Sequence, residues 1–305
     1  MSSYLAHRLF QALVTTVVTA IAVFIMVRIA PGDPIEVLLG DMASAEEIAR
    51  GREAYGLDQP ILVQLAIYLG KAATLDFGKS ITQGVPVHEL VLSRVGPSVL
   101  LGVVTILLTI VIAIPLGILC ALHRDRPLDK VASGGAFVAL SLPDFWLGIV
   151  LILVFARKLH WLPSSGSSAL ALIMPAVTLA LPLAAVNLRL MRNETIGVLK
   201  APYVTLARAR GLRPLDILRR HVLRNAVIPV LTIGGVQFGH LLGGAAVIES
   251  VFGWPGVGQL LIRSIATRDY PVVQGCIILM TVMVVVVNLL VDLAYRYIDP
   301  RFRSA

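Results

Sequence analysis

The segment Ala201–Pro229 reads APYVTLARARGLRPLDILRRHVLRNAVIP and lies between two long apolar stretches. Residues 203–210 favour a helix, and Gly211 directly after them supplies the left-handed residue that commonly ends one. Pro214 suits the first position of a following helix, because the N–H of that position has no intrahelical partner. The sequence therefore predicts two short helices joined by a tight turn.

The second of these helices has one apolar face. Leu215, Leu218 and Val222 follow each other at helical spacing, while Arg219 and Arg220 lie mostly off that face. An exposed turn with an apolar ridge and basic flanks can insert into a groove on another protein. The alternative interpretation is a solvated basic loop that charge alone keeps on one side of a membrane.

Composition places the whole chain in a membrane. Its 305 residues are 57% hydrophobic and 14% charged, and the mean hydropathy is +0.86, too apolar for a soluble domain of this length. The two cysteines, Cys120 and Cys276, stand in apolar runs, so the chain has neither a disulfide framework nor a CxxC metal site. We expect an all-α integral membrane protein.

Six apolar stretches are long enough to cross about 30 Å of hydrocarbon. The first, Leu9–Val27, has no charged residue; a secretory signal is the alternative, but the run is long for one and no small-residue cleavage site follows it. The other five predicted spans are Val99–Leu122, Val131–Ala156, Ala169–Leu188, Ala226–Ile248 and Val272–Val291. Pro115, Pro143, Pro175 and Pro182 interrupt three of them.

The positive charges predict the orientation. With the amino terminus inside, 16 of the 26 Lys and Arg residues fall on the inner side, nine of them between Arg189 and Arg224. Both termini and the basic loop should therefore face the cytoplasm. The net charge of +8 could also suggest a nucleic-acid partner, but the arginines gather beside the spans and form no soluble basic face, so we expect none.

Between the first two spans lies a polar segment that predicts a small extracytoplasmic subdomain. In it, Ser44 and Glu47 have the spacing of a capping box. Gly78-Lys79-Ser80 resembles the end of a P-loop, but Ala73 stands where that motif needs glycine. The predicted division is a first helix at 1–30, the subdomain at 31–97, a core of five predicted spans at 98–296 with the basic loop at 195–225, and a cytoplasmic tail at 297–305.

The fifth span carries the candidates for a transport pathway. Gly235, Gly239 and Gly243 line one helix face and allow another backbone to approach; packing within the chain explains them equally well. His240 lies near the middle of this span, where an ionisable residue is costly. For the other ionisable residues in or beside the spans, a structural role is the first interpretation: Asp144, Glu249 and Asp292.

The basic loop resembles a known family. Tyr203-Val204, Ala207–Leu212, His221, Leu223–Ala226 and Ile228-Pro229 are similar to the EAA loop of ABC importer permeases, in the version found in dipeptide, oligopeptide and nickel permeases. Thr205 and Leu206 depart from the general pattern, which has glutamate and alanine there. Further similarity lies in Pro31–Pro34, in Glu249–Leu260 and in Asn288–Arg301, so that the resemblance extends over nearly the whole chain.

That resemblance implies a type I ABC importer permease fold in a bacterial inner membrane. It implies a second permease, two ATPase subunits and an extracytoplasmic substrate-binding protein as partners. The chain has no Walker A motif, so we expect it to be no enzyme, to hold no metal or cofactor and to leave ATP and Mg²⁺ to the ATPases. The residues expected to contact them are Thr205, Leu206, Ala207, Arg208, Arg210, Gly211, Leu212 and Leu215.

The cargo that the resemblance implies is a di- or oligopeptide. Nickel chelates, glutathione, opines and small oligosaccharides are alternatives within the same importer class, and no His, Cys or Met cluster favours nickel. Two other classes stay open: a secondary transporter driven by an ion gradient, and a membrane-anchored scaffold. A secondary transporter would be expected to have paired carboxylates and internal repeats, and this sequence shows neither. A scaffold would leave the two-helix loop unexplained.

Overall fold

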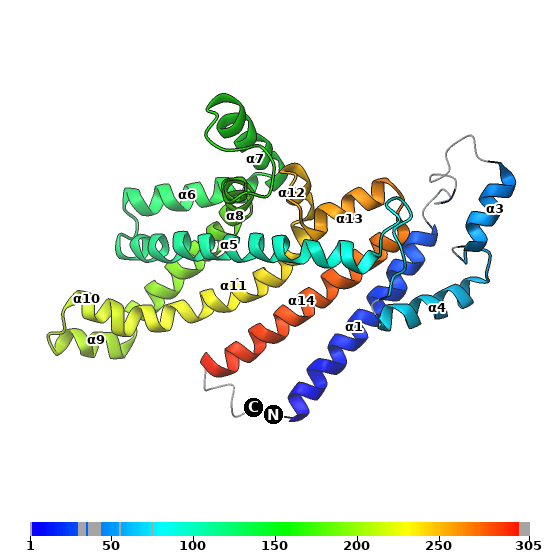
Figure 1. Cartoon of the computed structure of the whole chain (residues 1–305). Helices are drawn as coiled ribbons and strands as arrows, with labels where there is room; N and C mark the ends of the chain where they lie inside the picture. The colour runs from blue at the N-terminus through cyan, green and yellow to red at the C-terminus, as the bar shows by residue number, and fades with distance from the viewer. Residues whose placement is uncertain (1, 30–34, 36–43, 55, 75, 299–305) are drawn as a thin grey trace. The chain divides into compact units, whose positions relative to one another are not determined.

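The computed structural model describes residues 2–29, 35, 44–54, 56–74 and 76–298, which are helical apart from loops and one isolated antiparallel bridge between Lys79 and Pro86. The chain divides into two compact units. One comprises residues 1–98 and 255–289, and the other comprises residues 99–254 and 290–305. Two helices in Figure 1, α5 (Val87–Leu122) and α14 (Tyr270–Ile298), contribute residues to both units.

The first unit contains α1 (Ser2–Ile29), α3 (Ala45–Ala54), α4 (Ile61–Ala73) and α13 (Val257–Ala266). Helices α1 and α4 pack together, and the buried side chains of Phe24 and Tyr68 stack with ring centroids 5.5 Å apart. At the start of α13 the backbone N–H of Val257 donates to the hydroxyl of Ser98, 2.9 Å away. This bond satisfies one of the amides that every helix amino terminus leaves unpaired.

The predicted capping box is confirmed at the start of α3. The amide of Ser44 donates to Glu47 Oε2 over 2.9 Å, and the amide of Glu47 donates to Ser44 Oγ over 3.3 Å. The amide and hydroxyl of Ser44 thereby lower the pKa of the Glu47 carboxyl below its usual value.

One carboxylate ties a loop to the corner between α13 and α14. Asp269, almost fully buried, accepts hydrogen bonds from the hydroxyl of Ser80, from the amide of Ile81 at 3.1 Å and from the amide and hydroxyl of Thr82 at 3.2 and 2.8 Å. Ser80, which the sequence placed in a false P-loop match, is therefore bound to a carboxylate of its own chain.

The second unit is built around α8 (Ala169–Leu199). It contacts α6 (Pro127–Ser141), α7 (Asp144–Leu151), α11 (Arg224–Gly244) and α12 (Ala246–Val251). Figure 1 shows α6 and α11 beside this central helix. The remaining elements are the π-helix η1 (Ile152–Lys158), α9 (Pro202–Ala209), α10 (Pro214–Ile217) and the π-helix η2 (Leu218–Leu223).

Burial of apolar side chains explains the central place of α8. Ser168 caps its start, because its hydroxyl accepts the amide of Ala171 over 3.2 Å. Beyond the cap, apolar residues on several faces of the helix are buried, among them Met174, Leu179 and Met191. A helix that is apolar all round belongs inside a bundle.

Four described helices are long and apolar enough to cross a membrane by length and composition, and a bent pair makes up to five. The four are Val87–Leu122, Ala169–Leu199, Pro214–Gly244 and Tyr270–Leu293. The first predicted span lies in α1, whose apolar stretch Phe10–Met26 is shorter. The all-helical structure with several candidate membrane spans agrees with the prediction, while the count of six stays a prediction.

The predicted span over Val131–Ala156 is not one continuous helix. The chain forms two helices there, Pro127–Ser141 and Asp144–Lys158, which meet at 103°. Leu142 and Pro143 between them have extended backbone angles, because proline disfavours a helical conformation in the residue before it. Pro175 and Pro182, in contrast, lie inside the continuous α8.

Other boundaries also differ from the predictions. α5 begins at Val87 and not at Val99, and α8 continues to Leu199 and not to Leu188. Both helices thus extend beyond the apolar stretches from which the spans were predicted. Pro31–Pro34 and residues 299–305 of the predicted tail lie outside the described residues.

Candidate functional site

The turn after α9 has the geometry that its glycine predicts. Gly211 adopts a φ of +77°, its amide donates to the carbonyl of Arg208 over 2.9 Å, and the amide of Leu212 donates to the carbonyl of Ala207 over 3.3 Å. These two bonds form a Schellman motif, which satisfies the last carbonyls of the helix. Pro214 then opens α10, as predicted.

The helix after the turn is not short. α10, η2 and α11 run on without a break from Pro214 to Gly244, a helix of 31 residues. The prediction of two short helices is therefore wrong for the second one, and Pro229 does not interrupt it. The turn is consequently joined to the fifth predicted span by helix and not by a flexible linker.

The loop has a small apolar core of its own. Val204 and Ala207 on α9 are buried against Ile217 and Val222 on the following helix. Val222 and the half-buried Leu218 therefore pack inside the loop, contrary to the prediction that they form an exposed ridge with Leu215. Such a core holds the two helices in a fixed relation.

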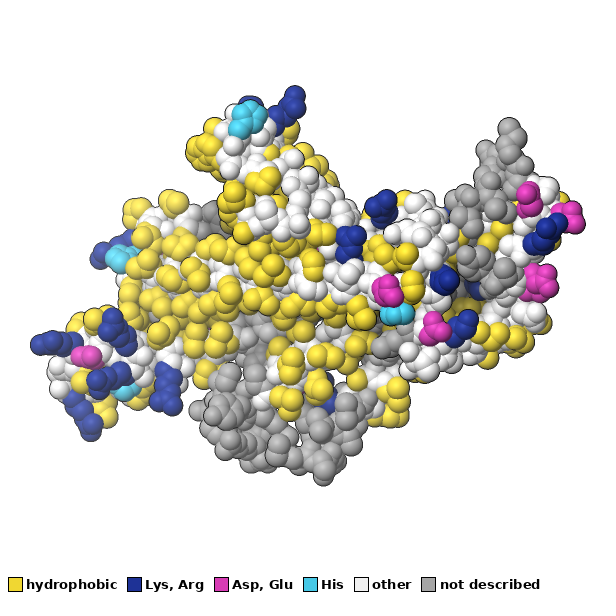
Figure 2. All heavy atoms as spheres, in the orientation of Figure 1, with side chains coloured by type: hydrophobic (Ala, Val, Ile, Leu, Met, Phe, Trp, Pro, Cys, Tyr) yellow, Lys and Arg dark blue, Asp and Glu magenta, His cyan; other side chains and the backbone are white. Residues whose placement is uncertain are grey.

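Four apolar side chains of the loop remain exposed, and we call them the turn hydrophobics: Tyr203 (45% exposed), Leu206 (54%), Leu212 (40%) and Leu215 (55%). Tyr203 and Leu206 share a face of α9 because they are three residues apart. Leu212 and Leu215 lie on the other side of Gly211. Figure 2 shows Lys and Arg side chains gathered over the same loop.

The predicted contact residues divide into two groups. Ala207 is only 4% exposed and belongs to the core of the loop. The others are exposed: Thr205, Leu206, Arg208, Arg210, Gly211, Leu212 and Leu215. Tyr203 was not among the predicted residues, although its place three residues before Leu206 puts it on the same exposed face of α9.

Polar contacts fasten α9 to the helix that follows. The side-chain amide of Asn225 donates to the carbonyl of His221 at 2.7 Å and to the hydroxyl of Tyr203 at 3.3 Å. The rings of Tyr203 and His221 lie 6.4 Å apart. Tyr203 thus has a fixed position while part of its ring stays exposed.

The four predicted pathway residues have different surroundings. A Cβ on Gly235 would lie 2.6 Å from a methyl group of Val291 on α14, so this glycine allows a close contact within the chain. Gly239 is buried, whereas His240 and Gly243 are exposed. Packing within the chain explains Gly235; His240 and Gly243 remain candidates.

Sequence reasoning missed a polar bridge between α8 and α11. The side-chain amide of Asn187, 1% exposed, donates to Gln237 Oε1 over 2.6 Å and to the carbonyl of Leu183 over 2.8 Å. An uncharged pair of this kind cannot be found by a search for ionisable residues. It fastens the central helix to the helix that carries the predicted pathway residues.

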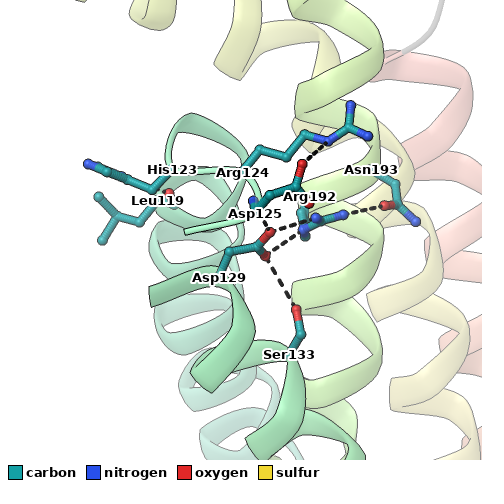
Figure 3. A network of polar contacts seen from close by, with 8 residues as sticks. All are labelled: Leu119, His123, Arg124, Asp125, Asp129, Ser133, Arg192 and Asn193. Atoms are coloured by element: carbon teal, nitrogen blue, oxygen red, sulfur yellow. Dashed lines mark hydrogen bonds and ion pairs between the residues drawn. The ribbon is translucent and has the colours of Figure 1, made fainter. Parts of the chain in front are cut away.

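A second missed contact is a buried ion pair (Figure 3). Arg192 on α8 donates from Nε and Nη2 to the two carboxylate oxygens of Asp129 on α6, both at 2.7 Å. The amide of Asp125 and the hydroxyl of Ser133 donate to the same carboxylate at 2.9 and 3.4 Å. Two parallel bonds from a guanidinium fix distance and orientation together.

The remaining ionisable residues suggest no chemistry. Asp144 is exposed in the first turn of α7, where a negative charge favours the helix. Glu249 is buried and Asp292 half-buried. In the part of the chain that the structure describes, no group of three or more His, Cys, Asp or Glu residues could hold a metal ion.

Comparison with known proteins decides the family. Residues 113–304 match the family described as "Binding-protein-dependent transport system inner membrane component", and residues 1–101 match its amino-terminal counterpart. The chain belongs to this family. It is therefore an ABC importer permease, as the resemblance of the basic loop implied.

Relatives match this permease over its full length. It is 38% identical to the glutathione transport system permease protein GsiC of Escherichia coli (strain K12) over 304 residues, 99% of both chains. It is 36% identical to the probable peptide ABC transporter permease protein y4tP of Sinorhizobium fredii (strain NBRC 101917 / NGR234) over 312 residues, 99% of this chain and 100% of the relative.

Solved structures agree on the fold. Two similar structures are those titled "Inward facing conformations of the MetNI methionine ABC transporter" and "Crystal structure of an amino acid ABC transporter with histidines". The first has a TM-score of 0.56 at 18% identity and covers 69% of the permease and 96% of that chain. The second has a TM-score of 0.51 at 19% identity and covers 68% of the permease and 94% of that chain.

Proposed function

We propose that this permease forms half of the translocation pathway of an ATP-driven importer of short peptides. The names of its full-length relatives, a glutathione permease and a probable peptide permease, support this cargo class. Glutathione is itself a tripeptide, so both names describe short chains of amino acids. Nickel chelates, opines and oligosaccharides are the alternative cargoes.

The observation that carries the proposal is the loop between α8 and α11, with four exposed apolar side chains on a helix-connected turn. Such side chains are costly to leave in water, and apolar or aromatic anchors with a charged rim are typical of protein interfaces. We infer that an ATPase subunit binds the turn hydrophobics. The exposed Arg208 and Arg210 then favour an acidic rim around the docking groove.

Further parts of the proposal concern the complete importer. A second permease of the same family supplies the other half of the pathway, two ATPase subunits bind ATP and Mg²⁺, and an extracytoplasmic binding protein delivers the peptide. Both termini and the loop face the cytoplasm. His240 and Gly243 line the pathway, and closure of the ATPases on ATP moves the loop and with it the helix Pro214–Gly244.

Docking is tested by variants at one position. Leu206→Glu places a charge where an apolar contact is expected, and the loss of one such anchor, about 1.4 kcal/mol or more, lowers the affinity for the ATPase at least about tenfold. Leu206→Met keeps an apolar side chain of similar size and is the matched control. Both variants are purified from membranes with their partners, and the ATPase that remains bound is measured by mass spectrometry.

Equal retention of the ATPase by both variants would contradict docking at this surface. The composition of the wild-type assembly is a separate result. Recovery of two ATPases, a second permease and a binding protein supports the importer. Recovery of the chain as a lone homo-oligomer would favour a gradient-driven carrier.

Cargo is tested by uptake into cells that lack the permease and cells in which it is restored. We expect ATP-dependent uptake of labelled dipeptides, tripeptides or glutathione, with unlabelled peptides competing. Restored uptake of chelated nickel and none of any peptide would overturn the peptide assignment. Uptake that persists without ATP and stops with an ionophore would overturn the importer mechanism.

A further inference from the structure

A cavity of about 260 Å³ lies between α1, α13 and α14 in the first unit. Most of its lining is apolar and includes Met26 on α1, Ile265 on α13 and Val273 on α14. Met26 and Ile265 are also largely exposed, whereas Val273 is buried. The cavity therefore has apolar walls and at its margin side chains that no other described part of the chain covers.

Two arginines lie at the same end of these helices. Arg268, which lines the cavity, follows α13 with a φ of +53°, a conformation uncommon for a residue with a side chain. Arg28, near the end of α1 and two residues beyond the lining residue Met26, holds its guanidinium 5.0 Å from the centre of the Phe24 ring. The Nε of Arg28 is buried without a hydrogen-bond partner.

Neither arginine is neutralised by the residues that the structure describes. No ion pair joins Arg28 or Arg268 to a described carboxylate. The adjacent acid, Asp269, directs its carboxylate to Ser80, Ile81 and Thr82. The site thus combines a half-buried arginine, a second arginine and an apolar cavity, and among the described residues no carboxylate forms an ion pair with either arginine.

The positions of Arg28 and Tyr270 within their helices indicate which part of the membrane surrounds the cavity. Arg28 comes two residues after the apolar stretch Phe10–Met26 of α1, and Tyr270 is the first residue of the apolar span in α14. Arginine and tyrosine at the ends of apolar helices are typical of the membrane–water interface, where headgroups lie. A cavity that begins there and continues between apolar helix faces suits a molecule with an anionic head and a hydrocarbon tail.

We propose that this cavity binds one acyl chain of an anionic phospholipid, with the lipid phosphate held by Arg268 and Arg28. Hydrocarbon gains little by leaving the bilayer for an equally apolar cavity, so the charges provide the selectivity. The cavity volume is below the about 300 Å³ at which small-molecule pockets usually begin, which suits part of one chain and not a whole lipid.

The assembled importer is the material for the test. It is purified in nanodiscs of equal parts phosphatidylglycerol and phosphatidylcholine with the same acyl chains, and native mass spectrometry counts the lipids retained. We expect the wild type to retain phosphatidylglycerol at least about fivefold over phosphatidylcholine, the preference that the attraction of one arginine to an anionic lipid provides. Arg268→Gln and Arg28→Gln should each reduce that preference towards one.

Two further variants separate the parts of the site. Arg263→Gln removes an exposed arginine of α13 that does not line the cavity, and it should leave the preference unchanged. Ile265→Trp keeps both arginines but fills cavity space, so it should lower retention of phosphatidylglycerol by limiting access of the chain. If an arginine variant fails to fold, Ile265→Trp still tests whether lipid retention depends on the cavity.

Several outcomes would overturn the proposal. One is equal retention of the two lipids by the wild type. Another is a preference that survives both arginine changes. Displacement of the lipid by excess inorganic phosphate would show that the arginines recognise phosphate alone. Absence of any retained lipid, together with a cross-link from Ile265→Cys to another subunit, would show that a protein helix occupies the cavity.

Discussion

Removal of the Asp129 charge tests how α6 is held to α8, the helix that leads into the basic loop. Asp129 is 4% exposed and its partner Arg192 is 21% exposed, with both bonds at 2.7 Å. Asp129→Asn keeps the shape of the side chain but leaves a guanidinium without its counter-charge. Breaking a buried pair in this way costs about 3–5 kcal/mol.

The structure places the expected loss near the lower end, at about 3 kcal/mol in the free energy of unfolding. Arg192 can hydrate through its exposed part, and its Nη1 already lies 3.4 Å from Asn193 Oδ1. Arg192→Gln in the Asp129→Asn background removes the second charge. Because a neutral pair leaves no unpaired charge, this double variant should recover most of the loss.

The assay is reversible unfolding of the purified permease in mixed detergent, followed by circular dichroism. Asp125→Asn is the matched control, because Asp125 belongs to the same network but its ion pair with Arg124 is exposed and 3.4 Å long. Its φ of 64° suits asparagine as well. The control should change stability by about 0.5 kcal/mol or less. The reasoning is refuted if Asp129→Asn costs no more than the control, or if the double variant loses as much as the two single variants together.

Three further outcomes are expected. Gly211→Ala should destabilise the turn by about 1–2 kcal/mol, because the φ of Gly211 is +77°, and it should lower uptake although the protein inserts normally into the membrane. The control is Gly197→Ala in α8, where a new Cβ would have nothing within 4 Å. This control should lower neither stability nor uptake. Asp269→Ala removes the acceptor of four hydrogen bonds from residues 80–82, so amide exchange of Ile81 and Thr82 should rise, and unchanged exchange would contradict the tether. Gly235→Ala should cost about 1–3 kcal/mol by overpacking against Val291, and adding Val291→Ala should restore most of the stability.

The sequence predicted most accurately what local chemistry determines. The left-handed Gly211, the first helical position of Pro214 and the capping box of Ser44 all occur in the structure. Each depends on residues within one helical turn, which the sequence shows directly. The apolar spans were found for the same reason, because composition and length alone identify them.

Helix ends and packing were harder to predict. The sequence gives no direct sign that α10 continues into α11, because the basic residues of η2 resemble a loop. Tryptophan beside an apolar span commonly lies at the membrane–water interface, but Trp254 is 2% exposed and packs with Phe252 and Leu101. Ala207 was expected to contact a partner but is buried in the loop. In each case tertiary contacts override a local preference.

The same limit applies to the candidate site. The loop was found from its motif, but which of its side chains remain exposed depends on how α9 packs on the helix after the turn. Asn187 with Gln237 and Asp129 with Arg192 join residues 50 and 63 positions apart. A single sequence does not reveal such pairs, since neither partner is unusual by itself.

The unbroken helix from Pro214 to Gly244 has a consequence for the proposed coupling. Leu215 and Gly235 are 20 residues apart, about 30 Å at 1.5 Å per residue. A flexible linker after the turn would absorb a displacement, whereas a continuous helix transmits it. In the proposed coupling, a displacement of the turn hydrophobics by the ATPase therefore reaches the predicted pathway residues. The π-turn at Leu218–Leu223 lies between the two. The hydrogen bonds of this π-helix are not those of an ordinary α-helix. We therefore expect the helix Pro214–Gly244 to change its twist at this point without breaking.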